Sequence, residues 1–346
     1  MPVEFHAELK TLRLTEPFRI AHGESFERQV VRVSARRDGI EAVGEAPFVP
    51  YFKDDPDETL SWLRELPNPL VENPRHGPRV ALLALDLLRI DMLGKATRKP
   101  FGRLWQQLSG NKWPAPPPGC RSFSLPGDLD EFAEKVRETN RQFRVLKLKL
   151  GSGDLERDEL IVIRARNAAT QATIFADVNG GWSPDETVRM IPRLLRWNIA
   201  FIEQPIHHRL GVAGWRELRA KLPSCLMPLY ADESAWTMDD VPQLAGLADG
   251  INVKLLKCGG WHRAREMILA ARVHHLKVML GCMIESSIGV TAAAHLAPLA
   301  DWVDLDGHLY VANDDYEGIQ YDEHGSLVMP DAPGIGVHRR GMTKSE

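Results

Sequence analysis

From Cys120 onward, short apolar runs alternate with amphipathic segments, a pattern typical of parallel strands joined by helices. The runs end near residues 124, 149, 177, 203, 232, 254, 282 and 306, and from residue 149 the intervals are 22 to 29 residues. Eight strands at this spacing predict a (β/α)8-type barrel over residues 120–315. An open doubly wound sheet is the alternative, but its usual glycine fingerprint is absent.

The first 112 residues follow a different pattern and are predicted to form a separate α+β unit. Apolar and polar positions alternate on both sides of Asp38-Gly39, which predicts a β-hairpin with a tight turn. Apolar stripes predict helices over residues 78–94 and 101–108. Four prolines fall between Trp113 and Gly119, so residues 113–119 are predicted to be a stiff linker.

Residues 316–346 depart from the barrel pattern again. Two short apolar runs, 319–321 and 327–329, predict a hairpin, and the residues after it are irregular. We expect this tail to return to the N-terminal unit.

The composition is that of a mildly acidic globular protein. Of the 346 residues, 44% are hydrophobic and 26% are charged, and the net charge of −4 argues against nucleic acid and anionic membranes as partners. The chain does not start with a basic segment and an apolar core, and it has no run of about 18 apolar residues, so we expect a cytoplasmic protein. The four cysteines are far apart and are interpreted as reduced thiols: Cys120, Cys225, Cys258 and Cys282.

Two lysines stand two residues apart in the apolar run 144–151. Side chains alternate along a strand, so Lys147 and Lys149 share one face and the intervening leucines take the other. An exposed edge strand would explain such a pair by itself. The residues at the ends of the next strands favour a different interpretation.

Three acids end three successive strands: Asp177, Glu203 and Asp232. Catalytic groups of barrels come from the carboxyl ends of the strands, so these side chains should converge. Their mutual repulsion would force protonation unless a hard cation lies between them, and ligation by oxygen alone favours Mg²⁺ over zinc. A single such acid would be read as the cap of the following helix, but three in succession favour a metal site.

Lys254 ends the next strand, which places it across the predicted barrel from Lys149. Two bases on opposite sides of a bound carboxylate are what a racemisation requires, because one removes the α-proton and the other returns a proton to the opposite face. The pKa of such a base must be lowered from its solution value. A salt bridge to one of the acids is the ordinary alternative for Lys254.

Together these motifs resemble the enolase superfamily, in the branch of muconate lactonizing enzyme. The resemblance implies a (β/α)7β-type barrel with a capping domain made by the N-terminal region and the C-terminal tail. It also implies an isomerase with a Mg²⁺ cofactor, in which Asn179 and Glu233 support the metal ligands; homo-oligomers are usual in this family. The motifs are Lys147-x-Lys149, Asp177-x-Asn179, Glu203-Gln-Pro205, Asp232-Glu-Ser234 and Lys254.

Within this branch, the segments 281–287 and 303–307 resemble the dipeptide epimerases. In those enzymes an aspartate pair binds the free α-ammonium of a dipeptide, a role that falls on Asp304 and Asp306, with Cys282 and Met283 also near the substrate. A solvated strand end is the alternative for the pair. The alternative functions are N-succinylamino acid racemase, o-succinylbenzoate synthase and a cycloisomerase-like lyase, and a non-catalytic binding protein is a remote alternative. The aspartate pair separates the epimerases from the first two activities, because the substrates of those enzymes carry no free ammonium.

The side chain that the substrate carries is left open. Relatives that act on L-Ala-D/L-Glu have an arginine in the loop after Pro17-Phe18 that pairs with the glutamate, whereas this chain has His22 or Gly23 there. The loop 48–54 offers Tyr51, Phe52 and Lys53 as further contacts. A cationic side chain could pair with Glu24 or Asp54, and an apolar one could contact the aromatic rings; packing of the loops themselves is the alternative.

Overall fold

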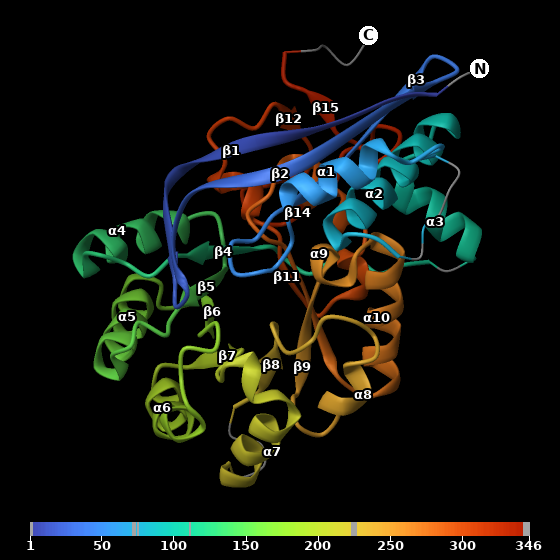
Figure 1. Cartoon of the computed structure of the whole chain (residues 1–346). Helices are drawn as coiled ribbons and strands as arrows, with labels where there is room; N and C mark the ends of the chain where they lie inside the picture. The colour runs from blue at the N-terminus through green and yellow to red at the C-terminus, as the bar shows by residue number, and fades with distance from the viewer. Residues whose placement is uncertain (1–2, 71–73, 75, 111, 223–226, 342–346) are drawn as a thin grey trace.

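The computed structural model describes residues 3–70, 74, 76–110, 112–222 and 227–341 (Figure 1). Cys225 and the last five residues of the predicted tail lie outside the described residues. The other three cysteines, Cys120, Cys258 and Cys282, carry free thiols.

Eight parallel strands, β4 to β11, form a single sheet in which each strand pairs with the strand that precedes it and the strand that follows it along the chain. A parallel bridge between Gly119 and Val303 brings the first and last strands together and closes the barrel. Each predicted strand end lies within two residues of the observed one, so the predicted barrel is confirmed. The strands are β4 (Cys120–Phe123), β5 (Val145–Lys149), β6 (Thr173–Asp177), β7 (Ile199–Glu203), β8 (Leu229–Ala231), β9 (Gly250–Lys254), β10 (Lys277–Gly281) and β11 (Trp302–Asp304).

Helices follow the first seven of these strands and surround the barrel (Figure 1). Several begin at a polar cap: the Asp128 and Asp154 side chains accept from backbone N–H groups, and Ser183 forms a reciprocal capping box with Glu186. The caps are therefore different residues from the acids that end the strands. The helices are α4 (Leu129–Thr139), α5 (Leu155–Ala168), α6 (Pro184–Arg196), α7 (Gly211–Lys221), α8 (Val241–Leu244), α9 (Leu255–Cys258), α10 (Trp261–Val273) and α11 (Ser287–Ala294), with short 3-10 turns at His208–Leu210, Ala297–Leu299 and Gly307–Tyr310.

The N-terminal unit is a three-stranded antiparallel sheet with helices against it. Strands β2 (Gly23–Arg37) and β3 (Ile40–Pro47) join at the predicted turn, where Asp38 and Gly39 both have positive φ. Strand β1 (Glu4–Ile20) was not predicted, because its residues are mostly polar and partly exposed and its pairing shifts between Arg13 and Phe18. The helices are α1 (Pro56–Arg64), α2 (Arg79–Ala96), which packs on β3, and α3 (Phe101–Ser109).

The hairpin of β1 and β2 reaches down to the barrel (Figure 1). Its two-residue turn, Ala21-His22, follows from the pairing of Ile20 with Gly23. The turn packs on the loop after β5, where a Cβ on Gly151 would lie 3.2 Å from that of Ala21. The N-terminal sheet therefore covers the end of the barrel at which the strands finish.

The C-terminal residues contact both other parts of the chain. The predicted hairpin is present as β13 (Gln320–Tyr321) and β14 (Leu327–Val328), while β12 (Tyr316–Glu317) pairs with β15 (His338–Arg339). Further on, the carbonyl oxygen of Gly334 accepts from the Phe101 N–H at 2.8 Å. Among the described residues, no helix combines the length and the apolar character needed to cross a membrane.

His295, at the end of α11, links three parts of the fold. Its Nδ1 accepts from the Gly102 N–H of α3 at 3.2 Å, and its Nε2 therefore donates to the carbonyl oxygen of Ile335 at 2.9 Å. Burial lowers the pKa of the imidazole from its usual value to about 4. The neutral ring is the form that the folded protein needs.

We expect this ring to make stability depend on pH. A base whose pKa is depressed by folding stabilises the protein above its unfolded pKa of about 6.5, and this contribution of about 3 kcal/mol is lost as the pH falls toward 4. The measurement is the free energy of unfolding in urea for the native protein and His295→Gln at pH 7.5 and 4.5. The native protein should be the more stable at pH 7.5, and the difference should shrink at pH 4.5. A difference that does not change with pH would contradict the assignment.

Candidate active site

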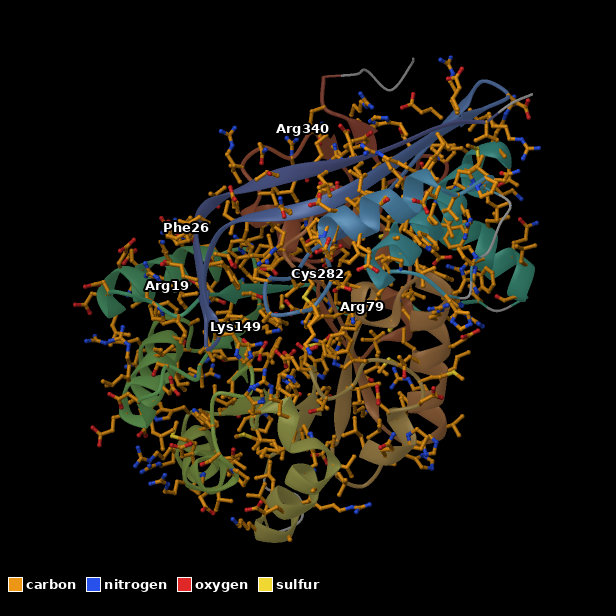
Figure 2. All side chains as sticks on the ribbon, viewed as in Figure 1. Arg19, Phe26, Arg79, Lys149, Cys282 and Arg340 are labelled. Carbon is orange, nitrogen blue, oxygen red and sulfur yellow. The ribbon has the colours of Figure 1, made fainter. Side chains whose placement is uncertain are left out.

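A cavity lies between the strand ends of the barrel and the N-terminal sheet, and residues of both line it. Figure 2 shows Lys149 near the tip of the β1–β2 hairpin and Cys282 below the N-terminal sheet. From the barrel come Ser122, Lys147, Lys149, Asn179, Lys254, Cys282, Met283, Asp304 and Asp306; from the N-terminal unit come Phe18, Ile20, His22, Glu24, Ser25, Arg28, Val49, Pro50 and Tyr51.

Lys147 occupies the centre of the charged cluster at the floor of this cavity. Its Nζ lies 3.0 Å from Asp177, 2.8 Å from Glu203 and 2.7 Å from Asp304, and the side chain is buried. Burial alone lowers the pKa of the ammonium, but the surrounding carboxylates outweigh it and the pKa is raised. Lys147 is therefore a fixed positive charge that joins acids from three strands.

Lys149 and Lys254 lie on opposite sides of the cluster. The Lys149 Nζ donates to Asp177 at 2.6 Å and to Asn179 at 2.9 Å, and the Lys254 Nζ donates to Asp232 at 2.7 Å. Their strands, β5 and β9, are four apart in a closed ring of eight, which is the largest separation that the barrel allows.

The expectation of a lowered pKa does not hold for Lys254 in this arrangement. Burial lowers its pKa, but the attraction of Asp232 is stronger and the pKa is raised. Pairing with a carboxylate favours the charged form of the lysine.

The acids Asp177, Glu203 and Asp232 form a buried site that can bind a metal ion. One carboxylate oxygen from each lies within 4.8 Å of the others. Burial and the neighbouring Asp177 raise the pKa of Glu203 to about 8, which is the response of a carboxylate held close to other anions. A donor set made of oxygen alone suits a hard divalent cation.

Polar side chains around the triad fix its orientation. Asn179 Nδ2 donates to Glu233 at 2.9 Å, and Asn252 Nδ2 donates to Glu203 at 2.6 Å. Burial and the charge of Asp232 raise the pKa of Glu233 to about 7. Asn179 and Glu233 thus lie beside the acid triad, and their support of a bound metal ion stays a prediction.

Lys257 belongs to the same cluster but was not singled out from the sequence. It is fully buried, and its Nζ contacts Asp232 Oδ1 at 2.6 Å and the carbonyl oxygens of Asp232 and Asn252. Its position three residues after Lys254, one turn into α9, is the signal that would have identified it.

Asp304 and Asp306 both line the cavity and share a hydrogen-bond donor. Both accept from the Ser122 hydroxyl, at 3.0 and 3.3 Å. Asp304 also pairs with Lys147, and Asp306 pairs with Arg121 at 3.1 Å. The pair is buried and faces the cavity, so it does not form a solvated strand end.

The predicted contacts from the N-terminal unit divide into two groups. His22 and Tyr51 line the cavity and lie 5.2 Å apart between ring centroids; burial and the neighbouring His207 lower the pKa of His22. Phe52 and Lys53 are not among the lining residues. Phe52 packs on Trp236 outside the cavity, and Lys53 is exposed.

The sequence and the fold were compared with known proteins. Residues 129–341 match the family described as enolase C-terminal domain-like. A relative from Maribacter sp., named L-Ala-D/L-amino acid epimerase, is 30% identical over 341 residues, which cover 94% of this chain and 96% of the relative.

Solved structures agree with this match. The L-Ala-D/L-Glu epimerase of Bacillus subtilis, in a substrate-liganded complex, has a TM-score of 0.85 at 25% identity and covers 98% of this chain and 99% of its own. The dipeptide epimerase of Methylococcus capsulatus, complexed with Mg and the dipeptide L-Arg-D-Lys, has a TM-score of 0.84 at 28% identity and covers 97% and 99%.

These relatives confirm the resemblance predicted from the strand-end motifs, because their names describe them as epimerases, a class of isomerase, that act on dipeptides. Because the family match spans more than half of the chain, and a relative 30% identical aligns with almost all of it, the chain belongs to the enolase superfamily.

Proposed function

We propose that this protein is a Mg²⁺-dependent dipeptide epimerase that inverts the α-carbon of the C-terminal residue. The observation that carries the proposal is the placement of Lys149 and Lys254 on opposite sides of one buried acid cluster. The names of the relatives support the same reaction class.

Asp177, Glu203 and Asp232 would hold the Mg²⁺ ion, because their oxygens already converge. When bound, the ion supplies positive charge that stabilises the negative charge developing on the substrate carboxylate. Lys147 adds a second fixed positive charge beside the same position.

The proton transfer uses the two facing lysines. One lysine, in its neutral form, removes the proton from the α-carbon, and the electrons of the broken C–H bond pass into the carboxylate to give an enediolate. The other lysine, as an ammonium, donates its proton to the opposite face, and the same electron pair forms the new C–H bond. The configuration is inverted, one lysine has gained a proton and the other has lost one.

Asp304 and Asp306 are proposed to bind the free α-ammonium of the dipeptide. Two buried carboxylates that face the cavity favour a cationic group, and this feature separates the proposal from the N-succinylamino acid and succinylbenzoate reactions. Cys282 and Met283 also line the cavity.

Replacing either lysine should abolish inversion but leave proton exchange with one epimer. We expect Lys149→Ala and Lys254→Ala each to lower the rate of inversion by about 10³-fold or more, because each removes one of the two proton-transferring groups. Each variant should still exchange the α-proton of one epimer for deuterium, and the two variants should act on opposite epimers. The measurement is proton NMR of single dipeptide epimers in D₂O.

The exposed Lys277→Ala is the control and should behave as the native enzyme. Exchange of the same epimer by both variants would contradict the assignment of the lysines to opposite faces.

Mg²⁺ should stabilise the protein as well as activate it. At 100 times its dissociation constant the ion would contribute about 2.7 kcal/mol, or about 5 °C in melting temperature. Glu203→Gln should lose this shift because it removes one carboxylate ligand, whereas Glu217→Gln, on an exposed helix surface, should keep it. The checks are melting temperature against Mg²⁺ concentration and loss of exchange with EDTA. A native melting temperature that Mg²⁺ does not change would refute the metal site.

A further inference from the structure

Arg28, on strand β2, is a buried guanidinium that faces the cavity. Its exposed fraction is 7%, and it is one of the lining residues. Its two hydrogen bonds are long, at 3.3 Å to the Phe48 carbonyl oxygen and 3.4 Å to the Ser25 hydroxyl, and its Nε has no partner among the described residues. The hydrogen-bonding capacity of this side chain is therefore largely unused.

Arg28 also differs in charge pairing from the other ionised groups that line the cavity. The lysines pair with the barrel acids, Asp306 pairs with Arg121, and Glu24 pairs with Arg19 at 2.5 Å. Within the described part of the chain, no carboxylate lies within ion-pair distance of Arg28. Burial lowers the pKa of Arg28, in keeping with a desolvated cation that lacks an anion.

Arg32, four residues later in the same strand, is an arginine whose charge is paired. It is equally buried, and it pairs with Glu45 at 2.8 Å and with Asp315 at 2.7 Å. Glu45 stands directly opposite Arg32 in β3, but β3 ends at Pro47, which pairs with Val30. Arg28 lies past the end of β3, so no residue of that strand faces it and its side chain turns to the cavity.

A buried guanidinium without a counterion is costly to desolvate, and a ligand carboxylate would satisfy it with two parallel hydrogen bonds. The end of the substrate that would supply this carboxylate follows from the neighbours. Arg28 donates to the Phe48 carbonyl oxygen of the loop that carries Tyr51, and the Tyr51 ring lies 5.2 Å from that of His22. Asp306, by contrast, contacts Arg121 and Ser122 of strand β4. Arg28 is thus on the side of the cavity formed by the loop 48–54 and the Ala21-His22 turn, and this turn packs on the loop after the strand that carries Lys149.

We propose that Arg28 is the specificity-determining residue of this site and binds the side-chain carboxylate of a C-terminal glutamate or aspartate. The proposal rests on the proposed epimerase function. It gives a residue of strand β2 the role that an arginine of the loop after Pro17-Phe18 has in relatives that act on L-Ala-D/L-Glu.

The test compares L-Ala-L-Glu with L-Ala-L-Gln, which has nearly the same shape but no charge. The native enzyme, with Mg²⁺ in D₂O, should favour L-Ala-L-Glu in kcat/KM by about 10²-fold. Arg28→Met should lose activity toward L-Ala-L-Glu while keeping that toward L-Ala-L-Gln, and Arg28→Lys should be intermediate. Arg36→Met, an exposed arginine on the same strand, should leave the preference unchanged.

Melting temperatures distinguish this role from a structural one. Arg28→Met should be at least as stable as the native protein because it removes an unpaired buried charge, whereas Arg32→Met should be less stable because it leaves Glu45 unpaired. A native enzyme that does not prefer the acidic dipeptide would overturn the proposal. So would an Arg28→Met variant that is destabilised and loses activity toward both dipeptides equally.

Binding separates failure of this proposal from failure of the proposed function. Calorimetry with Mg²⁺ measures the Kd of L-Ala-L-Glu and L-Ala-L-Gln without any need for turnover. Tighter binding of the acidic dipeptide that Arg28→Met abolishes, in a protein that exchanges no dipeptide, would support Arg28 and refute the epimerase. Equal binding of the two dipeptides would overturn the role of Arg28, whatever the activity.

Discussion

The structure depends on neutralising carboxylates that are buried close together. Asp177, Glu203 and Asp232 are buried with one oxygen of each close to the others. Lysine ammonium groups outweigh burial and lower the pKa of Asp177 and Asp232, whereas burial and the charge of Asp177 raise the pKa of Glu203. Lys147 pairs with three acids. Lys257 contacts both the carboxylate and the backbone carbonyl oxygen of Asp232. Removing one partner from such a cluster leaves an uncompensated charge, so the lysines and acids constrain one another.

The closed barrel places charged side chains from distant parts of the chain around this cluster. Eight strands in sequential order bring their carboxyl ends to one face, and the four-strand separation of β5 and β9 fixes two lysines on opposite sides. The β1–β2 hairpin covers that face, which reduces water access and strengthens electrostatic interactions beneath it. Asp304 forms an ion pair with Lys147, so the part of the cavity proposed to bind the substrate ammonium adjoins the part proposed to bind its carboxylate.

The barrel and its charged cluster could be predicted because strand ends leave a strong local signal. Apolar runs set the strands, and a charged residue at the end of each run has few ordinary explanations. Strand β1 gave no such signal, since its polar residues are partly exposed. Lys257 lies in α9, a helix of one turn that is too short to show periodicity. Phe52 and Lys53 were proposed as contacts from a loop, and residue type alone does not say which way a loop side chain points.

Arg28 illustrates a second limit, because the absence of a partner is a property of three-dimensional arrangement. In sequence, Arg28 and Arg32 are equivalent: both are arginines on the same face of one strand. What separates them is the length of the neighbouring strand, since β3 reaches Arg32 with Glu45 and stops before Arg28. The end of one strand thus leaves a buried cation that lines the cavity without a counterion among the described residues, and a ligand that carries its own carboxylate would satisfy it.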